Sequence, residues 1–179
     1  MLSYVKRHNV QAHYRKIPGD IIRVVGVSDS AYKVETDETR ALVGDITLMM
    51  GSFTSPRADA LECEPFGVCV LLDYTCRRQK RVCRSTFAAE IRALNDCTER
   101  ARVIQLAVEE ALYGPITASR ALAIEEFSGS AVHTAALKTH LELCVDAKSV
   151  YTAIEATETK IPAESSLLSS IQSARELLD

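Results

Sequence analysis

Three stretches in the first half of the chain have the apolar patterns of β-strands. Residues 21–32 contain the run IIRVVGV, which is apolar on both faces, as expected for a central strand of a covered sheet. Residues 41–51 (ALVGDITLMMG) and 68–78 (VCVLLDYTCRR) predict a second and a third strand. Turn-like links join the three, so they are expected to form an antiparallel meander.

The apolar pattern then changes to a helical period. Ser85 or Thr86 is a suitable N-cap, and Gly114 with Pro115 should end the helix after Tyr113. The apolar positions that carry this period are Phe87, Ile91, Leu94, Ala101, Ile104, Val108 and Ala111. Residues 115–138 are ambiguous between a short helix and a connector.

The last third of the chain predicts a fourth strand and two more helices. LELCVD (141–146) reads as a strand, and AKSVYTAIEAT (147–157) as a short helix. A final helix opens at Pro162, and its apolar stripe consists of Leu167, Leu168, Ile171, Ala174 and Leu178. The order βββαβα plus a helix predicts a mixed α/β layer architecture.

Length and composition fit a single domain with an appendage. The chain has 179 residues, 47% of them hydrophobic, which is enough for one core. Residues 1–20 form a basic lead-in closed by Pro18-Gly19-Asp20, and residues 21–179 form the domain. The net charge is −3, so any contact with nucleic acid must come from a local basic patch.

Cysteine usage and hydropathy indicate an intracellular protein, in the cytoplasm or nucleus. None of the six cysteines forms a C-x-x-C pair, and several lie in apolar stretches, so structural thiols in a reducing compartment are expected. No apolar run reaches the roughly 18 residues of a membrane span. The basic N-terminus leaves a mitochondrial presequence open, beside a tether to a neighbouring domain; its cations are Lys6, Arg7, Arg15 and Lys16.

Three acidic residues lie in strongly apolar sequence, where a lone carboxylate is costly to bury. Asp29 belongs to the first strand, Glu90 to the helix face that packs on a sheet, and Asp146 ends the fourth strand. Taken singly, each has an ordinary explanation. Asp29 fits a strand-end turn, Glu90 a rim position or structural ion pair, and Asp146 a helix N-cap.

Considered jointly, the three acids predict a shared metal site. Two strands and a helix packed across them can bring the three carboxylates together, where they would repel one another. A pair of Mg²⁺ or Mn²⁺ ions would relieve that repulsion, and two such ions can activate a water against a phosphodiester. No Gly-rich phosphate-binding loop offers an alternative.

A basic run precedes the helix that carries Glu90. It is either a solvated hairpin tip or a surface that holds phosphate backbones. Its candidate nucleic-acid-binding residues are Arg77, Arg78, Lys80, Arg81, Arg84 and Ser85.

The segments around the three acids resemble the ribonuclease H domain of copia-type retrotransposon polyproteins, which follows the reverse transcriptase. The most specific block is Q-x-x-V-x-x-S-T-x-x-A-E, from Gln79 to Glu90. A second block, D-x-x-S-x-x-x-A-I, runs from Asp146 to Ile154, and SDSAYK surrounds Asp29. The resemblance covers about residues 21–178.

This resemblance implies a ribonuclease H fold and Mg²⁺-dependent hydrolysis of the RNA strand in RNA–DNA hybrids. By position, Asp29 would bridge both metals, Glu90 would bind one, and Asp146 would bind the other and orient the attacking water. The family's fourth carboxylate follows a fifth strand, which this chain is expected to lack, together with the last helix. The expected partners are a hybrid or other nucleic acid, and the polymerase part or an assembly that covers the sheet edge.

Two alternatives to the nuclease stay open. The fold can serve as a catalytically inactive structural subunit or binding module in a larger assembly. The second alternative is a metal-dependent DNA strand-transfer or exonuclease module on the same fold. The S-T-x-x-A-E block favours the retrotransposon ribonuclease H over this alternative.

Overall fold

The computed structural model describes residues 16–17, 21–32, 41–52, 69–80, 82–117, 137–156 and 167–176. Within these ranges the elements are β1 (Ile21–Ala31), β2 (Leu42–Ser52), β3 (Cys69–Arg78), α2 (Thr86–Tyr113), β4 (His140–Val145), α5 (Lys148–Glu155) and α6 (Leu168–Glu176). Their types and order confirm the prediction from the apolar pattern. The expectations for residues 1–15 and 118–136 and for a helix start at Pro162 lie outside the described residues.

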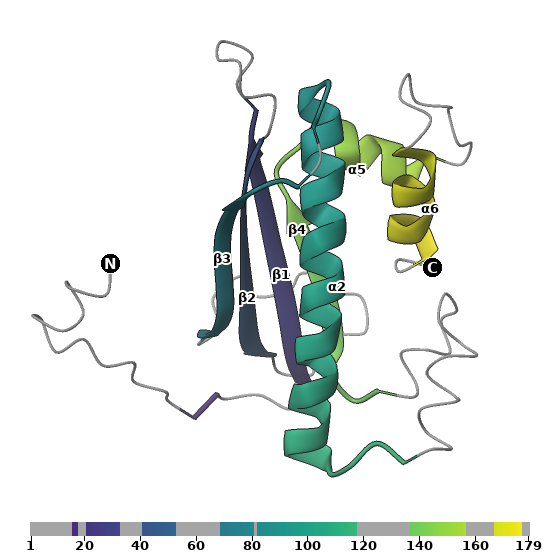
Figure 1. The fold of residues 1–179 in the computed structure, drawn as a ribbon. Coiled ribbons are helices and arrows are strands. Elements are labelled where there is room, and N and C mark those ends of the chain that lie inside the picture. The colour runs from purple at the N-terminus through teal and green to yellow at the C-terminus, as the bar shows by residue number, and fades with distance from the viewer. Residues whose placement is uncertain are drawn as a thin grey trace, which may run out of the picture.

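The strands form a four-stranded mixed sheet in the order β3-β2-β1-β4 (Figure 1). β1 pairs with β2 and β2 with β3 in the antiparallel sense, which confirms the meander, and β4 joins β1 in the parallel sense. β1 is therefore central, flanked on both sides. Val24 and Val25, on opposite faces of β1, are both buried, whereas Val27 is 36% exposed, so the expectation of a strand covered on both faces holds for only part of β1.

Helix α2 runs along the sheet, with α5 and α6 packed beside it (Figure 1). Small residues allow the close approach: a Cβ added to Gly26 of β1 would come within 3.0 Å of Cys97 Sγ and 3.2 Å of Ala101 Cβ. The helix face toward the sheet also buries Ala89 and Ala93 completely. Because the backbones lie this close, a side chain on that face reaches the sheet with little freedom.

The main core lies between α2 and the two C-terminal helices. Leu167, Ile171 and Ala174, three of the five predicted stripe residues of the last helix, are buried there with Ile91 and Leu94. Fully burying a Leu or Ile side chain contributes about 1.5–3 kcal/mol. The core therefore fixes α2 against α5 and α6.

Both ends of α2 match the sequence signals. Ser85 is the N-cap, and its side chain accepts a hydrogen bond from the Ala88 N–H at 3.1 Å. Gly114 ends the helix with φ at 88°, a left-handed value that favours glycine, and its N–H donates to the Glu110 carbonyl at 3.0 Å.

The C-terminal half of α2 also holds the entry to β4. Glu109, which is fully buried, accepts hydrogen bonds from the Thr139 N–H at 2.9 Å and the Thr139 hydroxyl at 2.8 Å. The Lys138 N–H donates to the same carboxyl group at 3.1 Å. Gln105 Nε2 donates to the Thr139 carbonyl at 2.8 Å. The residue before β4 is thus anchored on three of its polar groups.

The described cysteines form no disulfide, and they divide into two groups. Cys83 and Cys97 are buried, as expected of structural thiols, whereas Cys69, Cys76 and Cys144 are exposed. None of the helices in the described ranges combines the length and apolar character that a membrane span needs.

Candidate metal centre

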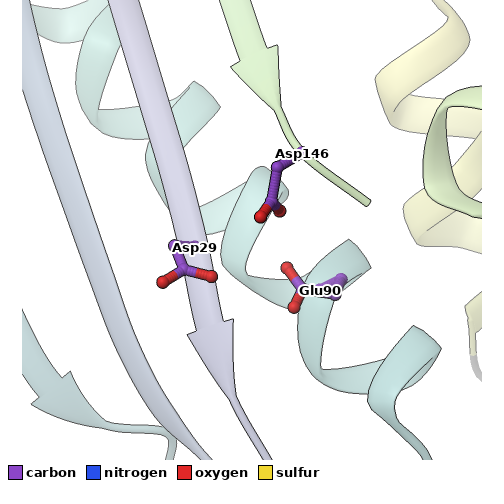
Figure 2. A group of neighbouring side chains, drawn as sticks. All are labelled: Asp29, Glu90 and Asp146. Carbon is purple, nitrogen blue, oxygen red and sulfur yellow. The ribbon is translucent and has the colours of Figure 1, made fainter. Parts of the chain in front are cut away.

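Asp29, Glu90 and Asp146, which we call the carboxylate cluster, come together at one end of β1 (Figure 2). Each offers one carboxylate oxygen, and these oxygens all lie within 4.8 Å of one another. They come from β1, from α2 and from the residue after β4. Groups separated by 61 and 56 positions in the sequence therefore share one small space.

The parallel pairing of β1 and β4 explains why two of the acids meet. The last pair in that ladder is Ser28 with Val145. Continued by one residue, the same register sets Asp146 beside Asp29, just past the point where β4 ends. Side chains of paired residues lie on the same side of a sheet, so both carboxylates turn the same way.

The third acid reaches the same point from α2. Ser85 fixes the start of the helix, and Ala89 and Ile91, which flank Glu90, are completely buried. Glu90 is itself only 6% exposed, whereas Asp29 and Asp146 are both exposed. The cluster therefore consists of one buried carboxylate, that of Glu90, and two carboxylates that are open to solvent.

Glu90 is in an environment that disfavours its charge. Burial raises the pKa of the Glu90 carboxyl above its ordinary value, and repulsion from Asp29 and Asp146 raises it further. The neighbouring Ser30 hydroxyl and amide oppose this shift. Even so, Glu90 Oε2 is a buried oxygen without a well-formed hydrogen bond to any described residue. A buried acceptor in this state is costly unless something positive binds it.

The ordinary explanations of the three acids fit less well. The N-cap of α5 is Ala147, and no side chain caps that helix, so the N-cap role considered for Asp146 is wrong. Asp29 lies inside β1, two residues before its end, and not in a turn. In the part of the chain that the structure describes, the salt bridges join other residues and none includes the cluster.

The donor set suits a hard divalent cation. All three ligands are carboxylate oxygens, which Mg²⁺ and Mn²⁺ prefer, and Mg²⁺ keeps several waters when few protein ligands are present. The orphaned Glu90 oxygen and the mutual repulsion of the acids are both relieved by such an ion. The residues present therefore fit the metal that the sequence predicts.

The basic run divides into side chains with different surroundings. Arg77 is held against α2 by an ion pair with Asp96 at 2.8 Å. Arg78, Lys80 and Arg84 are exposed, and Arg81 lies outside the described residues. Ser85 serves as the helix cap. A role of this run in binding nucleic acid stays a prediction.

Two further groups near the cluster make contacts that the sequence analysis did not predict. Ser30 follows Asp29, and strand alternation turns it toward α2, where it meets Glu90. Gln79, the first residue of the most specific block, is 3% exposed and donates from Nε2 to the Ala89 carbonyl at 2.7 Å. Alternation alone places Ser30 on the face of β1 opposite to Asp29, but the face that carries α2 and the path of the link from β3 to α2 were not available from the sequence.

In comparisons with known proteins, no family model, no curated protein and no solved structure matches this chain. The fold and the site define an α/β protein with a carboxylate cluster suited to divalent cations. A functional conclusion must therefore come from the geometry of the site and from the motifs around it.

Proposed function

We propose that this protein is a ribonuclease H-like nuclease of retrotransposon type, which hydrolyses the RNA strand of RNA–DNA hybrids with Mg²⁺ or Mn²⁺. The observation that carries the proposal is the convergence of three carboxylates, from strand, helix and strand in that order, within 4.8 Å. The choice of substrate depends on the sequence resemblance around these acids. The mixed sheet and the helix packed on it are compatible with the proposal.

Bound divalent ions would supply an activated water and neutralise the leaving oxygen of the phosphodiester. The protein's own part is to hold those ions with fixed oxygens. Asp29 and Asp146 present their carboxylates on the exposed side, where a phosphate can approach. Glu90 would hold the ions from the buried side of the cluster. By the resemblance, Asp29 would contact both ions, and Asp146 would also orient the water.

The exposed cations near the start of α2 fit the same substrate. Arg78, Lys80 and Arg84 lie in the segment that leads into the helix of Glu90. Cations at this position can neutralise backbone phosphates without reading base sequence. A hybrid duplex is recognised chiefly by its shape, backbone and 2′-hydroxyls, which suits such contacts.

A cleavage assay with a labelled RNA–DNA hybrid tests the proposal. The wild-type chain should cut the RNA strand in Mg²⁺ or Mn²⁺ and stop on addition of EDTA, while Asp29→Asn and Asp146→Asn should lose the activity. Asp73→Asn is the matched control, because Asp73 is an acid of β3 paired with Arg100 and not part of the cluster. Equal cleavage by the wild type and Asp29→Asn would refute the nuclease. Duplex DNA and single strands in the same panel separate it from the strand-transfer and exonuclease alternative.

A second candidate is a structural or binding module, and one observation favours it. Val27, Ile46 and Tyr74 lie side by side across β1, β2 and β3, and they are 36%, 43% and 55% exposed. A row of exposed apolar side chains is a common feature of interaction surfaces. Light scattering after gel filtration would detect self-association through this row. A monomer that cuts hybrid would count against the structural role.

A further inference from the structure

The link between β3 and α2 is tied to the helix beside Glu90. Gln79 begins the link and is buried, with its N–H donating to the Ala41 carbonyl at 2.8 Å. Its side-chain Nε2 donates to the Ala89 carbonyl at 2.7 Å, and its Oε1 accepts from the Cys83 thiol at 2.6 Å. Through its main-chain N–H and its side-chain amide, Gln79 thus joins the residue just before β2, the link and the first turns of α2.

Glu90 lies between two hydrogen bonds that join α2 to this link. Ala89, which receives the Gln79 bond, is the residue directly before Glu90 and is completely buried. Two residues after Glu90, Arg92 Nη1 donates to the Val82 carbonyl of the same link at 2.7 Å. The helix turn that carries the metal ligand is therefore held from the link on both sides of Glu90.

We propose that Gln79 is a positioning residue of the metal centre. It fixes the first turns of α2 against the sheet and so sets where the Glu90 carboxylate meets Asp29 and Asp146. This inference rests on the proposed function. The same bonds hold the link that carries the exposed Lys80 and Arg84, so the metal ligand and the phosphate-binding cations share one support.

The chemistry of the position accounts for the residue type. A donor and an acceptor are both needed at the end of one uncharged side chain, because one partner is a carbonyl and the other a thiol. The side-chain amide of glutamine offers a donor and an acceptor on separate atoms at the end of a long side chain. An ionised glutamate has no donor for the Ala89 carbonyl, and leucine has neither group.

Gln79→Leu tests the proposal, and Gln105→Leu is its matched control. Both glutamines are 3% exposed, and both donate Nε2 to a main-chain carbonyl, at 2.7 and 2.8 Å. Gln105 lies 15 residues from Glu90, about 22 Å along the helix. The two variants should lose similar amounts of Tm. Only Gln79→Leu should weaken Mn²⁺ binding to the full chain, by about tenfold or more, as measured by titration calorimetry.

A second pair of variants distinguishes the loss of this hydrogen bond from general unfolding. Cys83→Ser retains a donor for Gln79 Oε1 and should keep the wild-type Mn²⁺ affinity, whereas Cys83→Ala should lose part of it. Equal Mn²⁺ affinity in Gln79→Leu and Gln105→Leu would show that Gln79 is merely structural, and it would leave the nuclease intact. If the wild type binds no Mn²⁺, or if Asp29→Asn binds it equally well, the metal function fails and the role of Gln79 with it.

Discussion

Neutralising Glu90 should stabilise the metal-free protein, although the residue is a buried member of α2. The substitution Glu90→Gln keeps the size of the side chain and removes its charge. At 4.8 Å, two unit charges repel by about 3 kcal/mol at an effective dielectric of 20. Asp29 and Asp146 are exposed and screened by solvent, so we expect a net gain of about 1–2 kcal/mol. For a chain of this size that is a rise of about 2–8 °C in Tm.

Divalent metal should make the wild type more stable than Glu90→Gln, which is the reverse of the order expected without metal. An ion bound only by the folded state stabilises it by about 2.7 kcal/mol at a concentration of one hundred times Kd. The wild type would receive that gain and Glu90→Gln much less of it. Thermal unfolding followed by circular dichroism compares the Tm of the two proteins, first in EDTA and then in MgCl₂.

Glu109→Gln is the control within the same helix. Glu109 is fully buried like Glu90, but it accepts hydrogen bonds from the Lys138 and Thr139 N–H groups and the Thr139 hydroxyl. An amide NH₂ placed against those donors should cost about 2–4 kcal/mol, with or without Mg²⁺. If Glu90→Gln is instead less stable than the wild type in EDTA, Glu90 makes a favourable structural interaction. The physical case for a metal site would then be lost.

Three further predictions concern the scaffold around the site. Gly26→Ala should destabilise the fold by about 1–3 kcal/mol in urea unfolding, because the new Cβ would lie 3.0 Å from Cys97 Sγ; an unchanged midpoint would contradict that packing. Ser85→Ala should cost about 1 kcal/mol through the lost cap to Ala88, and no loss would show that the cap contributes nothing. Burial raises the pKa of the Cys97 thiol to about 12, so Cys97 should resist iodoacetamide at pH 8.5 until the protein unfolds, as followed by mass spectrometry. Because the Cys97 thiol has a pKa near 9 in the unfolded chain, its contribution to the free energy of unfolding should be complete below pH 9 and should be lost between about pH 9 and 12. Rapid alkylation of Cys97 in the native protein would refute the raised pKa.

The period of the apolar pattern was enough to predict the elements and their order. The apolar run around Val24 and Val25 belongs to the central strand of the sheet, and Ser85 and Gly114 mark the two ends of α2 through capping chemistry that is local to the sequence. The three acids are distinctive in the sequence because a carboxylate in apolar surroundings is costly to bury without a partner.

The partners of buried polar groups could not be predicted in the same way. Asp45 lies in β2 with its side chain fully buried, 3.4 Å from Arg100 of α2, and nothing in the sequence links the two. Glu109 is part of a Glu-Glu pair in the last turns of α2, yet it is buried under the entry to β4. Both contacts depend on which strand lies beneath which turn of α2, and this is set by tertiary packing.

Strand β4 is held at both ends by one helix. Thr139, just before the strand, is anchored to Glu109, and Asp146, just after it, meets Glu90. The six residues between them act as a spacer of fixed length, since each residue of a strand advances about 3.3 Å and alternates sides. Removing one residue from β4 would draw Asp146 back and turn its carboxylate to the opposite surface. The carboxylate cluster therefore limits the length of this strand as strictly as the sheet limits its side chains.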